Sequence, residues 1–241
     1  MRCSQLSLLV GAALAASTLA AQPRPAAPAP AQLMAVAPAG ARIVYTFDEP
    51  GLQPPQFTMT VDENGVGHFV SQAGTPPPDD TDDVYPAPMN REIHLDPGLL
   101  AKLFGYARAH QYFNEACSRR GRLAFTGNKT ISYAGPQGHG SCAFIWAADP
   151  ELQELSDRLN AVAFTLEIGR RLDVEMHHYP LGLDAELESL ETAVQQQQAS
   201  DLANIAPELE YIASDQDAMN RVRKRAQALL SQCEEAGAGS Q

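Results

Sequence analysis

The feature that most constrains the fold of this 241-residue chain is a pattern that occurs twice: alternating apolar residues, then Asp-Pro, then apolar residues at helical spacing. Alternation is typical of strands with one buried face, such as Ile43, Tyr45 and Phe47. Asp96-Pro97 and Asp149-Pro150 predict two helix starts, because Asp caps a first turn and Pro is favoured at its first position. The pattern therefore predicts an α+β fold, in which helices pack against an antiparallel β-sheet.

The first strand pair is predicted to turn at Asp62-Glu63-Asn64-Gly65, residues that are typical of tight turns. If the turn has an even number of residues, His68 lies on the same face as Met59 and Val61. His68 is then either a metal ligand or a histidine at the edge of the core. We favour the edge of the core, because no second ligand lies at a suitable spacing.

The second strand pair, 130–134 and 141–146, flanks a glycine-rich loop at 135–140. His139 and Ser141 lie here and are candidates for the base and nucleophile of a hydrolase. A nucleophile elbow has a flanking glycine on each side of the serine, and Gly140-Ser141-Cys142 lacks the second glycine. We favour a simple hairpin loop and keep the catalytic pair as the alternative.

After Pro180, apolar residues recur only at helical spacing, which predicts an all-helical C-terminal subdomain. Glu175 and His178 lie three residues apart before this point and could share a helix face as metal ligands. The favoured alternative is a polar helix end.

The predicted organisation of the whole chain is a signal peptide at 1–20, a Pro/Ala-rich disordered linker at 21–41, an α+β domain at 42–179, a helical subdomain at 180–233 and a disordered tail at 234–241.

The N-terminus has the composition of a signal peptide: a basic start at Arg2, then an apolar run from Leu6 to Ala20. Small residues before the junction predict cleavage between Ala20 and Ala21. The run is shorter than the roughly 20 residues that span a bilayer, although an uncleaved anchor is the alternative. We expect a periplasmic or secreted bacterial protein with no integral membrane segment in its mature chain.

The chain is acidic, with 29 Asp and Glu against 17 Lys and Arg and a net charge of -12. This balance disfavours nucleic acid as a partner, because a phosphate backbone requires clustered basic residues. Between Leu172 and Asn220 there are 11 Asp and Glu residues and no Lys or Arg. The stretch is either a surface for a basic protein partner or a soluble face that pairs with the basic last helix around Arg221 and Arg225.

Two resemblances follow from particular residues. Ala206-Pro207-Glu208-Leu209, with Ile212, Val222 and Leu229, resembles one helical pair of the HEAT type. The segments 129–146, 181–186 and 204–207 resemble a group of secreted bacterial proteins with no assigned activity. The resemblance implies a secreted protein of unknown function and supplies no catalytic residues.

The cysteines predict one disulfide. Cys3 leaves with the signal peptide, and export to an oxidising compartment favours a bond between the remaining cysteines. Cys142 alternates with Phe144 and therefore faces the core, and Cys117 follows aromatic residues that the same core should bury. We predict the pair Cys117–Cys142, with Cys233 outside the bond. The pair Cys142–Cys233 is the alternative.

No P-loop, HExxH or dinucleotide-binding motif occurs in the chain, and we expect no cofactor. Export, the acidic stretch and the lack of a recognisable catalytic set favour a non-catalytic protein-binding or envelope-associated module. The alternatives are an unrecognised periplasmic hydrolase that uses His139 and Ser141 or a metal at Glu175 and His178, and an inhibitor of a cationic enzyme.

Overall fold

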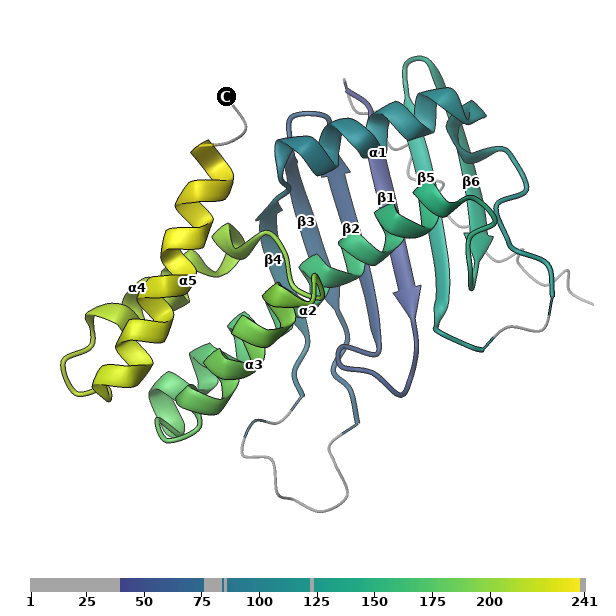
Figure 1. Cartoon of the computed structure of the whole chain (residues 1–241). Helices are drawn as coiled ribbons and strands as arrows, with labels where there is room; N and C mark the ends of the chain where they lie inside the picture. Colours follow the sequence, from purple (N-terminus) through teal and green to yellow (C-terminus); the bar gives the residue numbers. More distant parts are fainter. Residues whose placement is uncertain (1–39, 76–83, 85, 122–123, 239–241) are drawn as a thin grey trace, which may run out of the picture. The chain divides into compact units, whose positions relative to one another are not determined.

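The computed structural model describes residues 40–75, 84, 86–121 and 124–238, which belong to one compact unit. The predicted signal peptide, its cleavage between Ala20 and Ala21 and most of the predicted linker lie outside the described residues. Six strands form one antiparallel sheet in the order β4-β3-β2-β1-β5-β6 (Figure 1). They are β1 (Arg42–Asp48), β2 (Gln56–Asp62), β3 (Val66–Ser71), β4 (Met89–His94), β5 (Asn128–Gly135) and β6 (Gly138–Phe144).

Two helices, α1 (Pro97–Ala109) and α2 (Pro150–His178), lie across one face of this sheet (Figure 1). Both begin at the predicted Asp-Pro pairs. The Asp96 Oδ2 atom accepts a hydrogen bond from Leu99 N at 2.9 Å, and Asp149 Oδ1 accepts one from Glu151 N at 2.9 Å. The alternating apolar residues of the strands are buried beneath the helices, so the predicted α+β fold is confirmed.

The prediction for His68 is wrong. In the sheet Met59 pairs with Phe69 and Thr60 pairs with His68, so His68 lies exposed on the face opposite the core. The turn contains three residues, 63–65, instead of an even number, and Gly65 provides its positive φ of 85°. One residue more or less in a turn moves every following side chain to the other face.

The second hairpin is tighter than predicted. Gly135 pairs directly with Gly138, so only two residues form the turn, and the loop predicted at 135–140 belongs mostly to the strands. The predicted inward face is confirmed for Ile131 and Cys142, which are buried. Trp146 lies beyond the end of β6 and is only half-buried.

The C-terminal region consists of α3 (Leu183–Gln195), the short 3-10 helix η2 (Leu202–Ile205), α4 (Ala206–Ser214) and α5 (Asn220–Ala238). It has its own apolar core, as predicted, but the border between the two cores falls inside α2, between Leu166 and Ile168, and not at residue 180. α5 also continues through Ala238, so the part of the predicted tail up to that residue is helical.

Side chains of η2 and α4 cover the edge of the sheet at β4. The Asn204 amide accepts a hydrogen bond from His94 N at 2.7 Å and donates one to His94 O at 2.9 Å, as a neighbouring strand would. Arg91 donates to both carboxylate oxygens of Glu208, at 2.7 and 3.2 Å. These contacts protect an edge that would otherwise be open to further strands.

The predicted disulfide between Cys117 and Cys142 is present, and Cys233 lies outside it. The bond joins the segment after α1 to β6, with 25 residues of sequence separation. Within the residues that the structure describes, no helix combines the length and the apolar character needed to cross a bilayer.

Candidate functional site

A groove runs along the first half of α2. It consists of two adjoining cavities of about 720 and 460 Å³. Both cavities are lined by Trp146, Gln153, Asp157 and Gln197. Volumes of this size are typical of ligand sites.

The larger cavity is lined by four segments that are distant in the sequence: 47–57, 126–129, 146–164 and 197–198. β1 and β2 contribute Phe47 and Phe57, and the loop between them contributes Leu52. α2 presents a stripe at spacings of four, three and four residues, which places its members on one helical face. The members of this stripe are Gln153, Asp157, Asn160 and Phe164.

Apolar rings and side-chain amides dominate the lining of the larger cavity. Its apolar members are Phe47, Leu52, Pro54, Phe57, Trp146, Ala161, Ala163 and Phe164. Its amides are Gln53, Gln153, Asn160, Gln197 and Gln198. Apolar surface supplies binding energy and amides fix the orientation of polar groups, so this composition suits binding.

Lys129 lies at the floor of the groove in a core position, with only 3% of its surface exposed. Its ammonium group donates to Ile145 O at 2.8 Å and to Thr126 O and Oγ1, both at 3.2 Å. It also lies 6.0 Å from the ring centre of Phe47 and 5.9 Å from that of Trp146. Burial lowers the pKa of Lys129, while the charge of Asp157 acts in the opposite direction. Three acceptors match the three N–H donors of the ammonium, so Lys129 serves as a fixed charge and not as a nucleophile.

Hydrogen bonds hold the polar side chains of the groove in place. Gln153 accepts from Ala147 N at 2.9 Å and donates to Asp157 at 2.8 Å. The buried Tyr45 hydroxyl donates to Asn160 Oδ1 at 3.0 Å. Partial burial raises the pKa of Asp157, against the lowering effects of Gln153 and Lys129. The groove is therefore organised before any ligand arrives, which reduces the entropy cost of binding.

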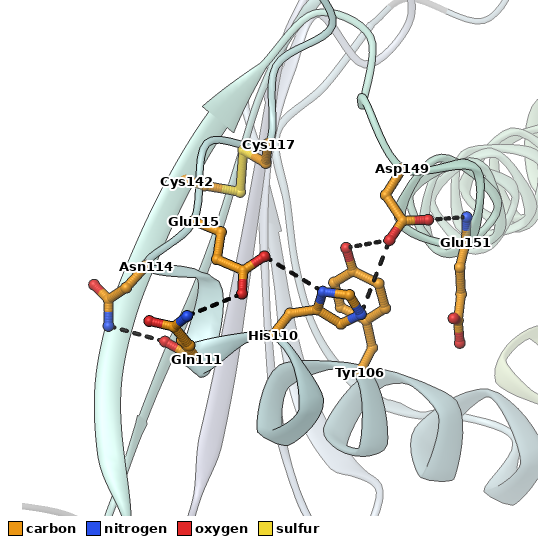
Figure 2. A network of polar contacts seen from close by, with 9 residues as sticks. All are labelled: Tyr106, His110, Gln111, Asn114, Glu115, Cys117, Cys142, Asp149 and Glu151. Carbon is orange, nitrogen blue, oxygen red and sulfur yellow. Dashed lines mark hydrogen bonds and ion pairs between the residues drawn. A yellow bond between two sulfur atoms is a disulfide. The ribbon is translucent and has the colours of Figure 1, made fainter.

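A second polar cluster joins the end of α1 to the start of α2 (Figure 2). His110 lies between two carboxylates, with Nδ1 3.6 Å from Glu115 Oε2 and Nε2 3.9 Å from Asp149 Oδ2. The Tyr106 hydroxyl donates to the same Asp149 oxygen at 3.1 Å, and the Tyr106 and His110 rings stack 4.0 Å apart. Burial, followed by the hydrogen bond and charge of Asp149, raises the pKa of Tyr106.

An unusual backbone segment follows His110. Gln111, Tyr112 and Phe113 have φ angles of 50°, 57° and 68°, a left-handed turn of three non-glycine residues. Such residues cost about 1–2 kcal/mol each and persist only where the surroundings fix them. Here Asn114 Nδ2 donates to Gln111 O at 2.9 Å and to His139 O at 2.7 Å, and the Tyr112 ring stacks on Tyr133 at 4.9 Å.

The cluster around His110 is best explained as a brace between two helices. The cavity beside it has a volume of about 120 Å³, too small for most substrates, and the cysteines that line it are joined in the disulfide. Asp149 is committed to the cap of α2. The arrangement orients an imidazole, but no serine, threonine or free thiol lines this cavity, and the Tyr106 hydroxyl is engaged with Asp149.

The structure does not assemble the hydrolase pair predicted from the sequence. His139 and Ser141 are exposed on β6, and the Ser141 hydroxyl donates to Ile131 O at 3.3 Å. Neither residue lines any of the cavities described above.

The predicted metal ligands Glu175 and His178 do not share an accessible surface. Glu175 is 5% exposed, whereas His178 lies on the surface. Across the described ranges, no group of three or more His, Cys, Asp or Glu side chains is arranged to hold a metal ion.

The acidic stretch is largely engaged within the molecule. Arg225 forms ion pairs with Asp184, Glu188 and Glu191, and Arg171 pairs with Glu186 at 2.6 Å. These contacts support the interpretation in which the last helix neutralises its acidic neighbours. They leave less of the stretch available to a basic partner.

Sequence analysis missed the groove, although one sign of it was present. Lys129 alternates with Ile131 and Tyr133 and therefore had to face inward, which is rare for a lysine. No protein-family model and no curated protein matches this chain. The geometry of the groove is therefore the principal basis for a functional hypothesis.

Proposed function

We propose that this protein is an exported, non-catalytic binding module that holds an extended, largely apolar segment of a partner protein in the groove along α2. The observation that carries the proposal is the groove itself, in which apolar rings alternate with amides that are already fixed by hydrogen bonds. Extended peptides are recognised in this way: polar side chains bind the backbone and apolar pockets accept alternate side chains.

The length of the groove supports a peptide over a small molecule. Its lining includes α2 residues from Pro150 to Phe164, which at 1.5 Å per residue corresponds to about 20 Å. An extended chain of about six residues has this length. The Cys117–Cys142 disulfide supports an oxidising compartment, in agreement with the expected export to the periplasm or beyond.

A matched pair of leucine variants tests the proposal. Leu52 lines the groove and is 52% exposed, whereas Leu181 lies outside it and is 87% exposed. The mature protein carrying Leu52→Glu should capture at least about tenfold less partner from an envelope extract than the wild-type protein does. The reason is that burying a leucine side chain against a ligand contributes about 1.5–3 kcal/mol to the binding free energy. Leu181→Glu should behave as wild type. Equal retention by all three proteins, or no specific capture by wild type, would contradict the proposal.

A further inference from the structure

A further cavity borders the groove at Arg158, where the end of β4, α2, the segment before η2 and α5 meet. Its volume is about 430 Å³, within the range of small-molecule sites. One side is apolar and includes Leu95, Val194 and Leu202. The charged lining residues are Arg158, Asp201 and Asp96, and the Asp96 carboxylate is already engaged as the cap of α1.

The Asp201 side chain is held in a fixed position. Its φ of 55° is left-handed, and its carbonyl oxygen accepts from Asn204 N at 3.0 Å and from Asn204 Nδ2 at 3.1 Å. Asp201 Oδ1 accepts from Asp96 N at 3.1 Å. The other oxygen, Oδ2, is buried and has no hydrogen-bond partner among the described residues. A buried carboxylate oxygen without a partner is energetically costly, and a new hydrogen-bond donor would relieve that cost.

Arg158 has the complementary property. Its Nε atom is buried without a partner, and within the described ranges the side chain forms no ion pair. Other partly buried arginines in the same part of the chain are paired with carboxylates: Arg91, Arg170, Arg171 and Arg225. An arginine that lacks a carboxylate is unexpected in a chain with 29 acidic and 17 basic residues.

The two charges face one cavity but do not pair with each other. Burial raises the pKa of Asp201 to about 6, an effect that the Asp96 charge increases and that Arg158 opposes. The carboxyl group is therefore ionised at neutral pH. With Asp96 engaged in the cap of α1, the cavity offers the charges of Arg158 and Asp201 beside an apolar wall, which is complementary to a zwitterion with an apolar substituent.

We propose that this cavity binds a free α-amino acid with an aliphatic side chain. The ligand carboxylate accepts from the Arg158 guanidinium, and the ligand ammonium donates to the Asp201 carboxylate. The Ser200 hydroxyl, which is also buried without a partner among the described residues, provides a further polar contact. The aliphatic side chain packs against Leu95 and Val194. Arg158 also borders the smaller cavity of the groove, but the other residues of this site do not, and the inference does not depend on the proposed binding of a peptide in the groove.

Calorimetric titration of the mature protein near pH 7.5 tests the proposal with L-leucine, L-isoleucine, L-valine and L-methionine. For leucine, two analogues that each lack one charge, 3-methylbutylamine and 4-methylpentanoate, serve as comparisons. At least one amino acid should bind. If leucine does, each analogue should bind at least about tenfold more weakly, since a charged hydrogen bond is lost. No binding by any of the four, or an analogue that equals leucine, would overturn the proposal.

Variants of the two charged residues provide a second test with the amino acid that binds best. Arg158→Gln and Asp201→Asn should each weaken binding at least about tenfold. The exposed residues Arg120 and Asp217 provide the matched controls Arg120→Gln and Asp217→Asn, which should bind as wild type. Wild-type affinity in both cavity variants would refute the assignment. The analogue series uses the wild-type protein, so it remains decisive if a variant fails to fold.

Discussion

Replacing Asp201 by Asn should stabilise the ligand-free protein near pH 7.5 more than near pH 4. Burial raises the pKa of Asp201 to about 6 in the folded state, whereas an unfolded aspartate titrates near 3.9. Between these values the folded protein holds a proton that the unfolded chain has lost. The contribution of this group to stability is therefore complete below about pH 4 and is lost as the pH rises through about 6.

The size of the effect follows from the same two values. A pKa difference of about two pH units corresponds to at most about 3 kcal/mol of unfolding free energy. Because Asp201 retains some exposure, we expect about 2 kcal/mol. Asn keeps the acceptor that Asp201 offers to Asp96 N and also tolerates the left-handed backbone, so these contributions are the same at both pH values.

Urea unfolding followed through the fluorescence of Trp146, the one tryptophan of the chain, measures this difference. The stability of Asp201→Asn relative to wild type should be about 2 kcal/mol greater near pH 7.5 than near pH 4. Asp217→Asn, at an exposed site, should show little change with pH. A relative stability of Asp201→Asn that is equal at both pH values, or greater near pH 4, would refute the reasoning.

Two further predictions concern the contacts of β6 with the segment after α1. Replacing Cys117 and Cys142 together by Ser should lower the unfolding free energy by about 3.5 kcal/mol, from the closure entropy of a loop with 25 residues of separation; a melting temperature equal to wild type in thermal unfolding would contradict this. Gly140→Ala should strongly destabilise the protein, because its Cβ would lie 2.2 Å from the backbone oxygen of Tyr112. Gly105→Ala, in an open helical position, should stabilise it by about 0.5–1 kcal/mol, and equal melting temperatures for the two glycine variants would be the opposing result.

Local patterns were sufficient to predict most of the sheet and both of its helices. Ile43, Tyr45 and Phe47 alternate because one face of β1 is buried, and the caps at Asp96 and Asp149 depend only on neighbouring residues. The prediction failed where the face of a strand depends on the number of residues in the turn before it. Composition does not distinguish a three-residue turn from a two- or four-residue turn, and His68 was therefore assigned to the wrong face.

The candidate sites were beyond prediction because they depend on contacts between distant segments. The groove combines the loop after β1, Trp146 beyond the end of β6 and one face of α2. The left-handed turn from Gln111 to Phe113 contains no glycine or asparagine that would indicate it. Asp201 and Arg158 lie 43 positions apart in the sequence, and only the fold shows that they line the same cavity.

The measurement that tests the central claim most directly is photo-crosslinking from the groove in intact bacterial envelopes. A photoreactive phenylalanine analogue replaces Leu52 in one protein and the exposed Leu181 in another. The account predicts that position 52 crosslinks to one partner through an extended, apolar segment, identified by mass spectrometry, and that position 181 does not. Crosslinks of the same partner from both positions, or from position 181 alone, would contradict a binding groove along α2.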